Sequence, residues 1–235
     1  MGYFDGVLWG VIPLVLIGLM LLAYGSANVC SNWYVPVVCK KKTHEKKICL
    51  TFDDGPQEQT LRILDILNHY QAKATFFVVG KKAIQNKHIV KEIDRHGHLI
   101  GCHSYRHDFF FPLRSVRKIR REILDTNHLI EDLTGKRVQF FRPPFGVTNP
   151  LIGKALADQN MTSIGWSIRS WDTLKSNKKK IAHNLIKKMH PGDIILFHDT
   201  IPETAEVLKE LLEYLNLNNF ATVTIDELLK MKSYD

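Results

Sequence analysis

Charge is almost absent from the start of this 235-residue chain, where Asp5 is the only charged side chain before Lys40. Internal repeats and low-complexity tracts are also lacking, which argues against a fibrous repeat protein. With 45% hydrophobic and 24% charged residues, the composition is typical of a folded globular protein and not of a disordered one. The length suits one domain with a sizeable core.

Cysteine is scarce as well. The four cysteines form no C-x-x-C pair, which argues against a zinc ribbon and against a thioredoxin-like redox site. Cys49 and Cys102 lie in apolar, strand-like runs and are predicted to be small core residues. A disulfide between Cys30 and Cys39 requires a location outside the cytoplasm, and the sequence leaves this alternative open.

The uncharged start contains an apolar run over residues 7–24. At about 1.5 Å per residue, a helix over this run nearly spans the hydrocarbon core of a bilayer, so we predict a membrane anchor over residues 1–25. A cleaved signal peptide is the alternative. Signal peptides normally carry a positive n-region, whereas the only side-chain charge before this run is that of Asp5.

The rest of the chain alternates short apolar runs with longer amphipathic ones, which indicates a parallel α/β sheet. A linker over residues 26–46 contains a candidate edge strand at residues 33–38. Seven strands are predicted at residues 48–52, 74–79, 98–102, 139–142, 162–166, 194–198 and 221–224. Helices are predicted at residues 59–70, 82–95, 115–133, 150–159, 180–189 and 203–217.

This order of elements fits both an open sheet with helices on two faces and a closed barrel. The residues with chemical potential help to choose, because they follow the carboxyl ends of several different strands. Convergence of that kind at one face is how a (β/α) barrel builds its site. We therefore predict a distorted seven-stranded (β/α) barrel over residues 47–235, preceded by one transmembrane helix.

Two motifs suggest a metal site. Asp53 and Asp54 directly follow the first predicted strand, in the motif TFDDGP. Adjacent carboxylates repel each other unless a cation or hydrogen-bond donors compensate. His103 and His107, in HSYRH, are four residues apart, a spacing that lets both rings reach one ion. With Asp54 they make a set that suits zinc, and also cobalt, nickel or iron.

Two further motifs follow strands. In RPPFG the prolines stiffen a loop, and Arg142 at its start can bind a carboxylate through two hydrogen bonds. His198 ends the apolar strand at residues 194–198. Taken alone, each of these motifs has an ordinary explanation as a turn or loop.

Taken together and in this order, the four motifs closely resemble those of the polysaccharide deacetylases, also called the NodB-homology domain or carbohydrate esterase family four. The resemblance runs from about residue 47 to about residue 231. It implies a distorted (β/α) barrel that holds a divalent metal, with zinc the first candidate. The residues that match the family's metal ligands are Asp54, His103 and His107.

The same resemblance implies the catalytic roles. Asp53 matches the catalytic base, Arg142 the arginine that orients the base, and His198 the general acid. Asp172 matches the aspartate that tunes this acid. The substrate contacts that we expect are those of Phe145, Gly146, Trp166, Trp171 and Leu196, with Leu196 lining the pocket for the acetyl methyl group.

The chain departs from the family's fourth motif, Asp-x-x-Asp-Trp. Arg169 replaces the first aspartate and Thr173 replaces the tryptophan, which leaves one wall of the pocket undefined. Phe145 stands where many members have tyrosine, so a phenol hydroxyl is missing, although the backbone N–H of Phe145 remains available to an oxyanion.

The function implied is metal-dependent removal of N-acetyl groups from a polysaccharide that contains N-acetylglucosamine, such as peptidoglycan or a chitin-like oligomer. An esterase that removes O-acetyl groups from a xylan-type polymer with the same site is one alternative. Another is a non-catalytic, membrane-tethered glycan-binding protein, which the altered fourth motif would favour.

The net charge of +8 bears on location and partners. Lysines at positions 40–42, 46 and 47 favour a cytoplasmic domain by the positive-inside tendency, but they lie near the limit of that rule's reach. Because acetylated structural polysaccharide lies outside the cell, we expect a membrane-anchored protein with an extracytoplasmic catalytic domain. No nucleic-acid-binding module accompanies the lysines, so no nucleic-acid partner is expected.

Overall fold

The computed structural model describes residues 2–173, 177–232 and 234, with side chains from residue 12 onward. Its centre is a sheet of parallel strands in the order β1-β6-β5-β4-β3-β2-β8-β7, with β9 paired to β2. The strands are β1 (Val37–Val38), β2 (Lys47–Asp53), β3 (Ala74–Val78), β4 (Leu99–Cys102), β5 (Phe140–Phe141), β6 (Thr162–Ile164), β7 (Ile168–Arg169), β8 (Ile194–His198) and β9 (Ala221–Thr222).

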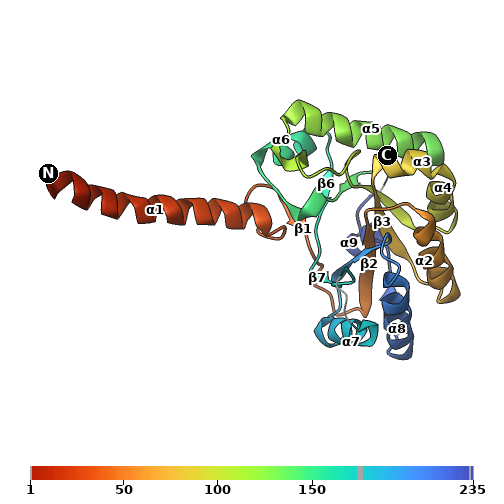
Figure 1. The fold of residues 1–235 in the computed structure, drawn as a ribbon. Coiled ribbons are helices and arrows are strands. Elements are labelled where there is room, and N and C mark those ends of the chain that lie inside the picture. Colours follow the sequence, from red (N-terminus) through yellow and green to blue (C-terminus); the bar gives the residue numbers. More distant parts are fainter. Residues whose placement is uncertain (1, 174–176, 233, 235) are drawn as a thin grey trace.

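Helix α1 (Gly2–Ala27) extends away from this sheet, and the other helices pack around it (Figure 1). These other helices are α2 (Glu58–His69), α3 (Gly80–Gln85), α4 (Lys87–Arg95), α5 (Val116–Thr134), α6 (Pro150–Ala157), α7 (Lys178–Lys188), α8 (Thr204–Leu217) and α9 (Ile225–Leu229). Helix α2 buries Ile63, Leu64 and Leu67 on one face, as its apolar spacing predicts. Under the helices, Phe52 of β2 stacks between Phe76 of β3 and Phe197 of β8.

All seven predicted strands are present, and β1 falls within the candidate edge strand at residues 33–38. Strand β7 was not predicted, because two residues are too few to show an alternating pattern. The helix predicted at residues 82–95 is divided into α3 and α4 at Asn86. The side-chain amide of Asn86 donates to the carbonyls of Pro56 and Lys82, and so competes with the helical hydrogen bonds.

The predicted seven-stranded barrel is corrected to an open half-barrel. The hydrogen-bonded path contains eight strands, and among the described residues its two end strands, β1 and β7, pair with β6 and β8 but not with each other. Their length explains the opening, because each end strand has two residues. The α/β class and the parallel order of the strands are confirmed.

The predicted transmembrane helix is also corrected. Helix α1 forms and extends away from the rest of the molecule (Figure 1), but among the described residues no helix is long and apolar enough to cross a membrane. The prediction of a membrane-anchored protein is therefore wrong on this finding.

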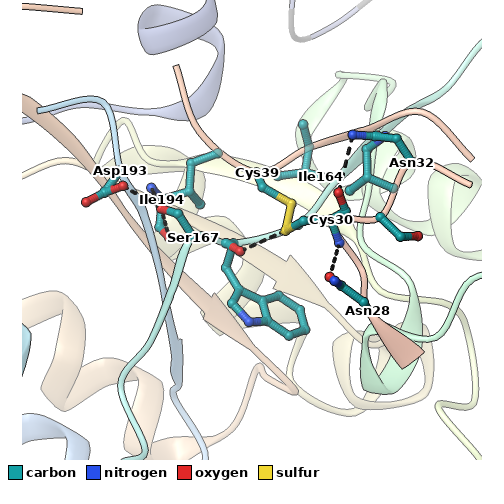
Figure 2. The surroundings of a disulfide bond; sticks show 12 residues. Asn28, Cys30, Asn32, Cys39, Ile164, Ser167, Asp193 and Ile194 are labelled. Atoms are coloured by element: carbon teal, nitrogen blue, oxygen red, sulfur yellow. Dashed lines mark hydrogen bonds between the residues drawn. A yellow bond between two sulfur atoms is a disulfide. The ribbon is translucent and has the colours of Figure 1, made fainter. Parts of the chain in front are cut away.

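The segment that follows α1 is fastened to the edge of the sheet. Strand β1 pairs with β6, and a disulfide joins Cys30 to Cys39, so the alternative that the sequence left open is the one observed. The Sγ atom of Cys30 lies 3.2 Å from the carbonyl oxygen of Trp166, beyond β6 (Figure 2). The sheet edge is thereby held beside the candidate site described next.

Candidate active site

Polar side chains gather at the carboxyl ends of the strands. Asp53 and His198 end β2 and β8 and face each other in the register of these neighbouring strands. His103 follows β4 and Arg142 follows β5, and the backbone N–H of Arg142 donates to the carbonyl of Cys102. Parallel strands that begin at one edge must end at the other, so residues far apart in the sequence meet around one mouth of the half-barrel.

Arg142 is the most constrained of these residues, with no solvent exposure. Its Nη1 donates to Asp53 Oδ1 at 2.8 Å and to Thr51 Oγ1 at 2.7 Å. Its Nε and Nη2 donate to the carbonyls of Ile164 and Gly165. The buried charge of Asp53 is therefore paired, and one of its oxygens, Oδ1, is committed to the arginine.

Asp54, His103 and His107 form a candidate metal site. Asp54 Oδ1 lies 3.6 Å from His103 Nε2 and 3.3 Å from His107 Nε2. One ligand atom from each residue lies within 4.8 Å of the others, which is close enough to share an ion. His103 Nδ1 contacts the carbonyl of Arg142 at 2.8 Å, which fixes the ring with Nε2 free for a metal.

The protonation states of these groups also fit a cation. Burial, followed by the charge of His103, lowers the pKa of His107 to about 4, so this ring is neutral near pH 7. Burial opposes ionisation of Asp54, but the hydrogen bond from His103 and the charges of the nearby imidazoles hold its pKa well below the usual range. One carboxylate and two imidazoles, of which that of His107 is neutral near pH 7, suit zinc, cobalt, nickel or iron.

His198 is paired with Asp172. Asp172 Oδ1 lies 3.0 Å from His198 Nδ1, and its Oδ2 accepts hydrogen bonds from the His198 backbone N–H and from Thr204 Oγ1. Burial lowers the pKa of His198, but the hydrogen bond and charge of Asp172 outweigh it, so the net shift is upward. Asp172 therefore engages Nδ1 of His198, and Nε2 is left available to a ligand.

Asp53, His198 and the three candidate metal ligands line a pocket of about 250 Å³, the reaction pocket. Of the predicted substrate contacts, four lie in it, namely Phe145, Gly146, Trp166 and Leu196, together with Arg169 and Thr173 of the altered motif. Gly146 has a φ of +69°, and a Cβ there would come within 2.5 Å of the Trp166 ring, so glycine is required. Trp171 is not among the residues that line this pocket and lies in the adjacent cleft.

Backbone strain is concentrated here. Asp54, Ser104, His107 and Phe145 all adopt positive φ values without being glycine. Such conformations are uncommon, and they cluster where the surrounding structure holds side chains in functional positions. The loops at this mouth are therefore shaped by the site and not by local preference alone.

Sequence reasoning missed several supporting residues. Thr51 binds Arg142, and Thr204 binds Asp172, but neither has a distinguishing sequence signal. Asp199 was also passed over as a neighbour of His198. It is buried beneath Gly55, where a Cβ would lie 2.1 Å from its carboxylate, and burial raises its pKa to about 7. Thr60 donates to its Oδ2.

Residues 40–164 match the model of one protein family, described as polysaccharide deacetylase. The chain belongs to this family. The match takes in the TFDDGP, HSYRH and RPPFG motifs, so the resemblance drawn from the motifs is confirmed.

Individual polysaccharide deacetylases extend the comparison. The chain is 36% identical over 84% of its length to the peptidoglycan-N-acetylglucosamine deacetylase PgdA of Listeria monocytogenes, and it spans 42% of that protein's length. It covers 94% of the solved Bc1960 peptidoglycan N-acetylglucosamine deacetylase, using 84% of its own length, with 28% identity and a TM-score of 0.79.

A third relative is not an active enzyme. BA3943 of Bacillus anthracis, a CE4 family pseudoenzyme, matches with a TM-score of 0.76 and 29% identity, over 83% of this chain and 69% of the other. Because the family contains such a protein, activity has to be argued from the residues of the site.

Proposed function

We propose that this protein is a hydrolase that removes N-acetyl groups from N-acetylglucosamine residues of peptidoglycan, with zinc as the metal. The observation that carries this proposal is the joint arrangement of two sets of groups around one pocket. One set is the Asp54, His103 and His107 cluster. The other is a carboxylate and an imidazole, Asp53 and His198, each oriented by a buried partner. The names of the relatives support peptidoglycan as the polymer.

A divalent metal held by Asp54, His103 and His107 would supply Lewis-acid chemistry, since it lowers the pKa of water and polarises the acetyl carbonyl. Asp53 Oδ1 accepts a hydrogen bond from Arg142, so Oδ2 is the oxygen that takes the proton of the attacking water. The backbone N–H of Phe145 stabilises the developing oxyanion, a contribution of about 3 kcal/mol for one such donor.

The amine must be protonated before it can leave. His198 gives this proton from Nε2, because Asp172 holds the proton on Nδ1. The raised pKa of His198 keeps a larger fraction of the ring in the imidazolium form that the step needs. Leu196 and Trp166 give the acetyl methyl an apolar wall.

Acetate release from purified peptidoglycan, from N-acetylglucosamine oligomers and from O-acetylated xylan tests the proposal. We expect release from the first two substrates, loss with a chelator, and recovery on addition of zinc. Asp53→Asn should keep the metal and lower kcat by about 100-fold or more. Release from xylan alone would identify an esterase, and metal-loaded protein inactive on all three substrates would refute the proposed activity.

A further inference from the structure

A second cleft opens directly beside the candidate active site. Its volume is about 760 Å³, and Trp166 and Arg169 line both it and the reaction pocket. A polymer with one sugar in the reaction pocket would therefore pass into this cleft with the next sugar. Trp171 also lines this cleft, and it is 50% exposed and thus available to a ligand.

The cleft carries three cationic side chains that form no ion pair with any described residue. Lys40, Arg169 and Lys188 line it, each from a different part of the chain. Among the described residues, no carboxylate lies within salt-bridge distance of any of the three. The guanidinium of Arg169 lies 4.9 Å from the centre of the Trp171 ring, which holds the charge against an aromatic face.

Of the described residues that line the cleft, one is an acid, and its oxygens accept hydrogen bonds from groups other than the three cations. Asp193 is 6% exposed, its Oδ1 accepts from Ser167 Oγ at 2.8 Å, and its Oδ2 accepts from the His190 backbone N–H at 2.7 Å. Figure 2 shows Asp193 and Ser167 near the Cys30–Cys39 disulfide, and Cys30 Sγ contacts the carbonyl oxygen of Trp166, which also lines the cleft. The hydrogen bonds of Asp193 therefore hold this side of the cleft in place and leave Lys40, Arg169 and Lys188 without a carboxylate partner among the described residues.

A neutral N-acetylglucosamine polymer would give these charges no partner, whereas an acidic substituent on the next sugar would. We propose that the cleft between Arg169, Trp171, Lys188 and Lys40 is a subsite for a sugar bearing a carboxylate, directly next to the acetylated sugar. The Trp171 ring packs on the sugar, and Arg169 binds the carboxylate, with the two lysines adding to the field. This inference rests on the proposed function, because the subsite would bind the sugar next to the one that the active site deacetylates.

The test compares two glycans that differ in one charge. Alternating peptidoglycan tetrasaccharides carry a lactyl carboxyl on every second sugar, and this group is left free in one probe and converted to the methyl amide in the other. Binding is measured by calorimetry on the zinc-loaded Asp53→Asn protein, so that no turnover is needed. We expect about 10-fold tighter binding of the carboxylate form, declining at high salt because the charges are partly exposed.

Arg169→Gln should bring the ratio of the two affinities close to one, and Lys188→Gln should lower it in the same direction. Lys209→Gln, which removes an exposed charge on α8, is the matched control and should keep the ratio of the parent protein. Equal binding of the two glycans by the parent, or an equal loss of preference in the control, would overturn the subsite.

Acetate release from the same glycans by the unsubstituted protein separates the two claims. Selective binding of the carboxylate glycan with no acetate release would refute the proposed activity and leave the subsite standing. Acetate release with no preference between the glycans would refute the subsite and leave the activity standing.

Discussion

His198 and Asp172 show how a single contact can set the chemistry of a residue. Burial alone would lower the pKa of His198, and the adjoining carboxylate of Asp172 reverses the direction of the shift. The pair is 26 residues apart in the sequence and is brought together at 3.0 Å. A general acid must be protonated to act, so this contact determines the pH range in which the proposed reaction runs.

Replacing Asp172 by asparagine should therefore move the alkaline limb of the pH profile. With the carboxylate removed, burial dominates and the pKa of His198 falls, so activity declines at a lower pH than in the parent protein. The measurement is kcat/KM for acetate release against pH. Asp65→Asn, on the exposed face of α2, is the control. An alkaline limb that stays where it is would exclude Asp172 as the group that tunes His198.

Among the strands, Arg142 acts as a buried connector. It follows β5, binds Thr51 and Asp53 of β2, and donates to the carbonyls of Ile164 and Gly165 at the end of β6. Replacing one partner of a buried ion pair leaves the other charge without compensation, which typically costs about 3–5 kcal/mol.

Arg142→Met should accordingly destabilise the fold by about 3–5 kcal/mol, measured as the free energy of unfolding in urea. Arg121→Met provides the comparison, because Arg121 is 81% exposed and its pair with Asp125 lies on the surface of α5. That change should cost about 0.5 kcal/mol or less. A similar small cost at Arg142 would mean that the buried network does not stabilise the strands.

The Cys30–Cys39 disulfide stabilises the edge element β1. It closes a loop with a sequence separation of 9 residues. Loop entropy for a closure of this size predicts a loss of about 2–3 kcal/mol when both cysteines are changed to serine. Reductant should bring the unfolding midpoint of the parent protein to that of the double variant and leave the variant itself unchanged. A midpoint unaffected by reductant would contradict this role.

Across the whole molecule, the candidate metal site joins the ends of separate strands and should couple binding to stability. A ligand that binds only the folded state stabilises it by about 2.7 kcal/mol at 100 times its dissociation constant. We expect zinc to raise the unfolding temperature of the chelated protein, and His103→Ala to abolish this rise. An equal rise in His103→Ala would place zinc binding at another site.

The sequence by itself determined the strands, most helices and the family. Those depend on local patterns, such as the apolar run of β2 followed by the acid pair, and a local pattern is visible without coordinates. It did not show the two-residue strand β7, because so short a segment has no periodicity, and it did not show where the helix at residues 82–95 breaks.

Only the tertiary structure decided which groups meet. The opening of the half-barrel, the disulfide at its edge, the place of Trp171 outside the reaction pocket and the unpaired cations beside it all depend on contacts between distant segments. The physical reason is that a side chain's partners, burial and field come from the elements packed around it. The spacing of residues along the chain does not reveal these partners, this burial or this electrostatic field.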